Sequence, residues 1–165
     1  MTTTRHFLDV DDLSCEELDS VVSLAALPVA EVPQVLAGRG AALVFEKPSA
    51  RTRSSTELAV VALGGHPVYI QGAEIGIDRR ETAEDVARTL ACFHAVLCAR
   101  VLDHDVLVRM VGALEATSPA TGSTATGSTA TGSTAGYDDR DDVCFPPSVP
   151  VVNLLSDRAH PCQAL

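Results

Sequence analysis

Short, mostly apolar runs alternate along the chain with stretches in which apolar residues recur every three or four positions. The runs cover residues 41–45, 68–70, 95–99 and 149–153. Strands of a parallel sheet are covered on both faces, so they carry continuous apolar runs instead of an alternating pattern. The pattern therefore predicts an α/β fold in a single domain, with a mostly parallel sheet flanked by helices.

Helical periodicity fills the intervals between these runs. Ser14 followed by Glu17 is a capping box, which predicts that a packing helix begins there, and Pro28 and Pro33 are expected to end it. Its apolar stripe contains Leu18, Val21, Val22 and Ala25.

Three more helices are expected, at residues 52–63, 82–90 and 103–115. The first of these has its predicted apolar face at Leu58, Val61 and Ala62. Residues 71–80 are polar and contain glycine, and are predicted to form a loop.

The segment that follows the first strand carries most of the candidate chemistry. Ser49 is a good N-cap for the next helix, whose free backbone N–H groups and partial positive charge favour an anion. Ser49 and Thr52 add hydroxyl donors, and Arg51 and Arg53 add guanidinium groups that match phosphate oxygens. Carboxylate and sulfate would also fit, and an ordinary capped helix with two solvated arginines is the alternative interpretation.

Two later positions extend this hypothesis. Arg100 ends the apolar run 95–99, and the carboxyl ends of parallel strands share one edge of the sheet, where ligands bind. Arg100 would then stand beside residues 49–53, although an arginine there could equally form a surface ion pair. Pro161 suits the first position of a helix, with His160 at its cap and Gln163 on its first turn. His160 could also be a plain helix-start residue.

Composition narrows the class of protein. A formal net charge of -10 disfavours nucleic-acid and anionic-membrane partners, so the arginines form a local basic site suited to a small anion. The five cysteines show no C-x-x-C spacing and are an odd number, which indicates a reducing, cytoplasmic environment. No targeting or membrane-spanning segment is expected.

A low-complexity tract interrupts the second half of the chain. Residues 120–134 are three tandem copies of Ala-Thr-Gly-Ser-Thr, and an acidic run follows at 138–142. Because such a tract has almost nothing to bury, residues 119–142 are predicted to be an inserted flexible linker. The α/β domain would then consist of residues 1–118 and 143–165.

Taken together, several separated motifs resemble the carbamoyl-phosphate half of the aspartate/ornithine carbamoyltransferases. The Phe-Glu-Lys opening and the His-Pro-Cys-Gln sequence are more similar to the ornithine branch than to the aspartate branch. The motifs are Phe45-Glu-Lys-Pro-Ser-Ala-Arg-Thr-Arg53, Leu63-Gly-Gly-His-Pro67, Ala99-Arg100, Asn153-Leu-Leu-Ser-Asp157 and His160-Pro-Cys-Gln163.

The resemblance implies a role for each matching residue. The phosphate of carbamoyl phosphate would be held by Ser49, Arg51 and Thr52. Two residues would be catalytic: Arg100 would bind the phosphate and the carbonyl oxygen, and His160 would polarise the carbonyl. Gln163 would hold the carbamoyl amide. The resemblance implies no metal or organic cofactor, and a homotrimer with shared active sites.

The sequence also departs from the family pattern. Ala50 stands where the phosphate motif usually has Thr, and Gly76 stands where relatives usually place a Gln or His that reaches the neighbouring subunit. The family's second domain, which binds the acceptor amino acid, lies beyond Leu165. We therefore expect an ornithine-type carbamoyltransferase represented by its carbamoyl-phosphate-binding domain. The alternatives are a truncated relative that binds carbamoyl phosphate or phosphate without turnover, or associates with a full-length homologue, and a decayed gene product that retains only the fold.

Overall fold

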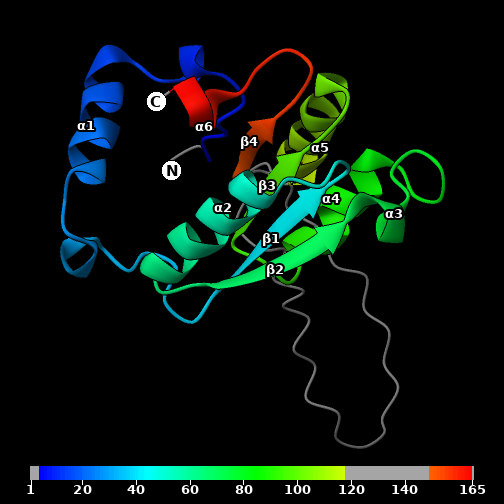
Figure 1. The fold of residues 1–165 in the computed structure, drawn as a ribbon. Coiled ribbons are helices and arrows are strands. Elements are labelled where there is room, and N and C mark those ends of the chain that lie inside the picture. The colour runs from blue at the N-terminus through cyan, green and yellow to red at the C-terminus, as the bar shows by residue number, and fades with distance from the viewer. Residues whose placement is uncertain (1–3, 118–148, 165) are drawn as a thin grey trace, which may run out of the picture.

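The chain folds into an open α/β sheet with helices on both faces (Figure 1). The structure is a computed structural model that describes residues 4–117 and 149–164. All neighbouring strands are parallel, in the order β2-β1-β3-β4. The strands are β1 (Gly40–Phe45), β2 (His66–Gln71), β3 (Val96–Arg100) and β4 (Val151–Leu155). The α-helices are α1 (Cys15–Ala25), α2 (Ala50–Ala62), α3 (Gly72–Ile75), α4 (Ala83–Ala91), α5 (His104–Thr117) and α6 (Pro161–Ala164), and the short 3-10 helices are Val10–Asp12 and Val29–Glu31.

The continuous apolar run of β1 is explained by its two covered faces. Ala41, Leu43 and Phe45 face α2 and share a cluster with Val60, whereas alternate residues of the same strand face α4 and α5. Successive side chains of a strand point to opposite faces, so both sets must be apolar. The predicted mostly parallel α/β architecture is confirmed.

The order of the strands reverses direction between β1 and β3. The chain leaves β1 towards β2 on one side and then returns to place β3 on the other side of β1. Such a reversal between β1 and β3 is the point where open α/β sheets bind ligands, beyond the carboxyl ends of their strands. The last residues of three strands lie level there, because Phe45 pairs with Arg100 and Arg100 pairs with Leu155.

The amino-terminal segment covers the outer edge of β4. The Phe7 amide donates to the Val151 carbonyl at 2.8 Å, and the Asn153 amide donates to the Phe7 carbonyl at 2.8 Å. The His6 ring accepts a hydrogen bond from the Val151 amide through Nδ1 at 3.1 Å. These bonds satisfy backbone groups that an uncovered edge would leave open.

The helix after β1 is confirmed, but its predicted apolar face is wrong. Val60 is buried against the sheet, while Leu58 and Val61 are 69% and 57% exposed. A residue two positions away on a helix lies on nearly the opposite side, so a helix that buries Val60 must expose Leu58. The helix also begins at Ala50, two residues before the predicted start.

The first helix forms as predicted, with the capping box of Ser14 and Glu17 in place. Its apolar stripe is not buried, however, because no residue of α1 is buried and Val22 is 53% exposed. Figure 1 shows α1 standing apart from the sheet at the left of the view. The expectation of a packing helix is therefore wrong for the part of the chain that the structure describes.

Three smaller differences concern element bounds. The predicted loop 71–80 contains the short helix α3, which Gly76 ends with a φ of 65°, a left-handed conformation that favours glycine. The strand predicted at 68–70 begins earlier, so that His66 is a strand residue and not part of a turn. The last strand lies two residues later than predicted.

The predicted linker 119–142 lies outside the described residues. Within the two described ranges, no helix combines the length and the apolar character that crossing a membrane requires.

Candidate functional site

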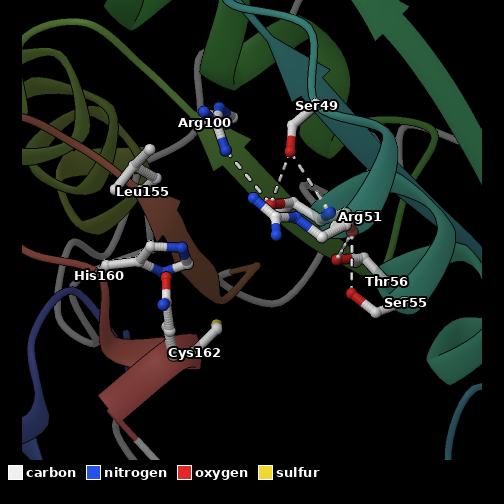
Figure 2. A pocket seen from close by; sticks show the side chains of 10 residues that line it. Ser49, Arg51, Ser55, Thr56, Arg100, Leu155, His160 and Cys162 are labelled. Atoms are coloured by element: carbon white, nitrogen blue, oxygen red, sulfur yellow. Dashed lines mark hydrogen bonds between the residues drawn. The ribbon is translucent and has the colours of Figure 1, made fainter.

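A pocket of about 490 Å³ lies at the carboxyl edge of the sheet, at the reversal between β1 and β3. It is bordered by the first turns of α2, the end of β3, the end of β4 and the start of α6 (Figure 2). Six of the seven residues proposed from the sequence line it, and the seventh, Arg53, does not. The described residues that line it are Ser49, Arg51, Thr52, Ser55, Thr56, Arg100, Leu155, His160, Cys162 and Gln163.

The start of α2 forms one wall. Ser49 has extended backbone geometry and is the N-cap, and its Oγ accepts a hydrogen bond from the Thr52 amide at 3.4 Å. The same hydroxyl donates to Thr52 Oγ1 at 3.0 Å. Only one of the amides in the first turn is thereby bonded to the cap side chain, and the remaining first-turn N–H groups have no partner within the helix. The wall therefore offers N–H and hydroxyl donors to an anion.

Arg100 forms the floor between the two walls. Its Nη1 donates to Thr52 Oγ1 at 3.2 Å, which confirms that the end of β3 meets the start of α2. Its Nε is buried and has no hydrogen-bond partner within the structure. Because a buried guanidinium N–H without a partner is costly, this atom marks a place where a ligand oxygen would be stabilised.

Glu46 holds the backbone at Arg100 and at the residues that follow it. The Glu46 amide donates to the Arg100 carbonyl at 2.9 Å, and Glu46 Oε2 accepts from the Leu102 amide at 2.8 Å. This double attachment follows a register shift between Ala99 and Arg100. The arginine is therefore presented from a braced strand end and not from a free loop.

His160 lies on the opposite wall, directly before α6, with its ring directed into the pocket (Figure 2). Its Nδ1 is buried and has no hydrogen-bond partner among the described residues. Next to it, Cys162 Sγ donates to the Asn153 carbonyl at 3.4 Å, and burial raises the pKa of this thiol. The thiol is thus held protonated at neutral pH.

Arg53 does not belong to the site, although it was predicted to contribute a guanidinium group. Its guanidinium carbon lies 3.7 Å from the centre of the Tyr69 ring, and its Nε donates to Glu57 at 2.8 Å. The hydrogen bond to Glu57 raises the pKa of Arg53. Arg51 and Arg53 are two positions apart in the sequence, and helix residues with this spacing point to nearly opposite sides, so Arg51 reaches the pocket and Arg53 does not.

Four lining residues were missed by the sequence analysis: Ser55, Thr56, Leu155 and Cys162. The first two follow Thr52 by three and four positions, a spacing that places them on the same helix face and could have revealed them. Both donate their hydroxyl hydrogens to the Thr52 carbonyl, at 3.1 and 2.8 Å. Leu155 and Cys162 are apolar or weakly polar, and no chemical signal marks them in the sequence.

The pocket suits a small anion with a polarisable carbonyl group. Its lining combines two arginines, a histidine, an amide and several hydroxyl groups, and none of the described residues that line it carries a carboxylate that would repel an anion. Within residues 4–117 and 149–164, no group of three or more histidine, cysteine, aspartate or glutamate side chains is placed to bind a metal ion.

Known proteins match this chain along nearly its whole length. The ornithine carbamoyltransferase of Bradyrhizobium diazoefficiens is 34% identical over 166 residues, which cover 98% of this chain and 43% of the relative. The enzyme of Mycolicibacterium gilvum is 36% identical over 167 residues, with 98% and 43% covered. The chain thus spans less than half the length of these relatives.

The fold is also that of solved ornithine carbamoyltransferases. The crystal structure from Thermus thermophilus superposes with a TM-score of 0.70 at 34% identity, covering 99% of this chain and 46% of that chain. The anabolic enzyme from Campylobacter jejuni gives a TM-score of 0.73 at 27% identity, with 98% and 42% covered.

A family model described as aspartate/ornithine carbamoyltransferase, carbamoyl-P binding domain, matches residues 5–165. This range contains every residue of the pocket. The chain therefore belongs to the aspartate/ornithine carbamoyltransferase family and corresponds to its carbamoyl-phosphate-binding domain.

Proposed function

We propose that this chain binds carbamoyl phosphate as part of an ornithine carbamoyltransferase, which converts carbamoyl phosphate and L-ornithine to citrulline and phosphate. The relatives that the chain matches along 98% of its length carry this enzyme name. The acceptor amino acid would bind to a second domain, which corresponds to the part of the relatives that this chain does not span.

One observation carries the proposal. Two buried nitrogen atoms, Arg100 Nε and His160 Nδ1, have no hydrogen-bond partner among the residues that the structure describes, and both belong to residues that line the same cationic pocket. Buried polar groups in folded proteins are nearly always paired, so two such atoms in one pocket support a ligand that pairs with both. Carbamoyl phosphate has the matching groups, namely phosphate oxygens and a carbonyl oxygen.

The binding roles follow from position in the pocket. The hydroxyl groups of Ser49 and Thr52, the first-turn amides of α2 and the Arg51 guanidinium would hold the phosphate. Ala50 contributes no side-chain donor to this cradle. Gln163, on the opposite wall, would bind the carbamoyl NH₂ through its side-chain oxygen.

Arg100 and His160 would act on the reacting atoms. In the transfer, the ornithine amine forms a bond to the carbonyl carbon, the bond from that carbon to the phosphate oxygen breaks, and phosphate leaves with the electron pair while the amine loses a proton. Negative charge therefore builds on the carbonyl oxygen and on the departing phosphate. Preorganised donors aimed at both lower the barrier most, and no metal or organic cofactor is part of this scheme.

The wider biological setting is part of the same proposal. The reaction would belong to amino-acid metabolism in the cytoplasm, in arginine biosynthesis, and the assembled enzyme would be a homotrimer, as the family resemblance implies. Residues 119–142 would be a linker inserted into a domain made of residues 1–118 and 143–165. Neither nucleic acid nor a membrane is a partner, in keeping with the formal net charge of -10.

Isothermal titration of the 165-residue chain with carbamoyl phosphate, and separately with inorganic phosphate, tests the proposal. A citrulline assay with ornithine on the same sample reports turnover. Saturable binding of carbamoyl phosphate, tighter than that of phosphate, is the expected result.

Binding without citrulline supports the binding role and assigns turnover to residues outside this chain. Absence of binding for both anions would contradict the proposal, and the family membership would then describe ancestry alone.

A further inference from the structure

Resting on the proposed function, we propose that Ser156 and Asn153 are positioning residues that hold His160 in register with Arg100. The feature that carries this inference is the turn between β4 and α6. Ser156 Oγ accepts hydrogen bonds from the Ala159 amide at 3.2 Å and from Asn153 Nδ2 at 3.2 Å. The Ser156 amide donates to the Ala159 carbonyl at 2.9 Å. The residue that precedes His160 is therefore tied back to Ser156 by both its amide and its carbonyl.

The Asn153 side chain also holds this turn, through hydrogen bonds from its Nδ2. This side chain is completely buried, and its Nδ2 also lies 2.9 Å from the Leu8 carbonyl and 3.3 Å from the Ala159 carbonyl. These acceptors fix the orientation of the amide, because the opposite orientation would place its oxygen against two carbonyl oxygens. Asn153 thus connects the β4 end and the amino-terminal segment to the turn that carries His160.

His104 connects this turn to the segment that carries Arg100. His104 is the first residue of α5 and follows Arg100 by four positions. Its Nδ1 lies 2.9 Å from Ser156 Oγ, and its amide donates to Asp157 Oδ1 at 2.8 Å. Ser156 Oγ accepts from Asn153 and Ala159, and its own hydrogen can be donated either to this ring nitrogen or to the Ala159 carbonyl, which lies 3.3 Å away.

Ser156 therefore contacts both the segment that follows Arg100 and the turn that precedes His160, the two residues proposed to be catalytic. It is only 7% exposed, and its hydroxyl contacts both the β3-to-α5 connection and the β4-to-α6 turn. Neither Ser156 nor Asn153 lines the pocket, so an effect of either residue on a ligand would be indirect. Because Ser156 is bonded to Ala159, the residue directly before His160, we expect this effect to pass through the placement of His160.

A double-mutant cycle tests this indirect action. Carbamoyl phosphate is titrated into the full 165-residue chain and into Ser156→Ala, His160→Ala and the double variant. We expect Ser156→Ala to weaken binding by about tenfold in the native background and by less than about twofold when His160 is already absent. Ser20→Ala is the matched control, because its hydroxyl bonds only to the Glu16 carbonyl on exposed α1.

Equal losses in both backgrounds, or no loss in the native one, would overturn the inference, since the hydroxyl would then not act through His160. A second pair of variants tests the inference independently, in case Ser156→Ala does not fold. His104→Ala should weaken binding, and His104→Asn, whose side-chain oxygen can accept the same Ser156 hydrogen, should restore it. Failure of the asparagine to restore affinity would likewise overturn the inference.

The His160 ring signals in NMR spectra of the ligand-free chain separate this inference from the proposed function. Displacement of these signals by Ser156→Ala and not by Ser20→Ala supports the positioning role, even if the native chain binds neither carbamoyl phosphate nor phosphate. Unchanged His160 signals would contradict it.

Discussion

Arg100 and Arg109 belong to consecutive elements, β3 and α5, but their guanidinium groups have opposite surroundings. Arg109 donates hydrogen bonds to Asp78 and, at 3.1 Å, to Glu84, and its Nε forms an ion pair with Asp105 Oδ2 at 3.2 Å. The hydrogen bond to Asp78 raises the pKa of Arg109 and lowers the pKa of that carboxyl group. Arg100 has a hydroxyl partner and a buried Nε without any partner, and the described residues provide it with no carboxylate.

The contrast separates an arginine whose partners lie within the fold from one that we propose binds an anion. Arg109 fastens the segment after α3 to α5, where Asp78 has a φ of 57°, a left-handed conformation that is uncommon outside glycine. Its hydrogen-bonding capacity is used within the protein. The capacity of Arg100 is left open towards a pocket, and that open capacity is what an anion would use.

The largest expected effect is on anion binding. Arg100→Ala should weaken the binding of carbamoyl phosphate by well over tenfold, because each hydrogen bond to a charged group contributes about 1.5–3 kcal/mol. Isothermal titration measures the change. Arg88→Ala, which removes an exposed arginine paired with Asp85, is the control and should leave affinity unchanged. Unchanged affinity in Arg100→Ala would remove the site assignment.

Replacement of Arg109 is expected to lower stability and to leave anion binding nearly unchanged. Arg109→Met should lower the free energy of unfolding by about 1 kcal/mol, since partly exposed ion pairs contribute ~0.2–1 kcal/mol each. The melting temperature should fall by about 2–4 °C, measured by calorimetry. Affinity for carbamoyl phosphate should stay within about twofold of the native value. If Arg109→Met lost affinity for carbamoyl phosphate while its melting temperature stayed native, the proposed difference between Arg100 and Arg109 would be wrong.

Two histidines give a similar comparison with a smaller effect. Among the described residues, His6 Nε2 and His160 Nδ1 are buried and have no hydrogen-bond partner, although His6 Nε2 lies 3.9 Å from Glu115 Oε1, and His6 Nδ1 accepts from the Val151 amide. Protonation would place a hydrogen against that amide, and burial lowers the pKa of His6 below its ordinary value of 6.5. The neutral ring therefore stabilises the fold above pH 6.5, and this contribution is lost as the pH falls through the lowered value.

Thermal unfolding between pH 7 and pH 5 measures this contribution. His6→Asn, which keeps an acceptor without a titrating group, should flatten the pH dependence, whereas His66→Asn on the exposed start of β2 should not. An identical pH profile in His6→Asn would assign the dependence to other groups.

The smallest expected effect is at Arg53. Because its guanidinium stacks on Tyr69 and bonds to Glu57, Arg53→Ala should change the affinity for carbamoyl phosphate by less than about twofold. Arg51→Ala, two positions earlier and on the pocket wall, should weaken binding by more than tenfold. Equal losses of affinity in both variants would contradict this prediction, because they would mean that Arg53 contributes to binding as much as Arg51 does.

Most of the fold could be predicted from the sequence because local signals and tertiary packing agree. The apolar run of β1 and the Ser49 cap each specify their element without knowledge of the rest. The rotation of α2 could not be predicted, because Leu58, Val60 and Val61 are all apolar and only the sheet decides which of them is buried. The exposed stripe of α1 was missed for the same reason.

The site was predictable where a residue type and its place in a strand or helix define a role. Arg100 at a strand end and Ser49 at a helix start are such cases, and the parallel sheet brings them together. Arg53 is turned away from the pocket by its contact with Tyr69, a residue of strand β2 that is distant in the sequence. Ser156 contacts His104, which is 52 residues away in the sequence. Contacts of this kind leave no local pattern.

The measurement that tests the account most directly is an NMR titration of the ¹⁵N-labelled 165-residue chain with carbamoyl phosphate. The account predicts that shifts concentrate in the amides of residues 49–53, Arg100, His160, Cys162 and Gln163, and that the amides of Asp78 and Arg109 do not move. Shifts centred on Asp78 and Arg109, or no saturable shift at any site, would contradict the claim that the unpaired arginine marks the anion site.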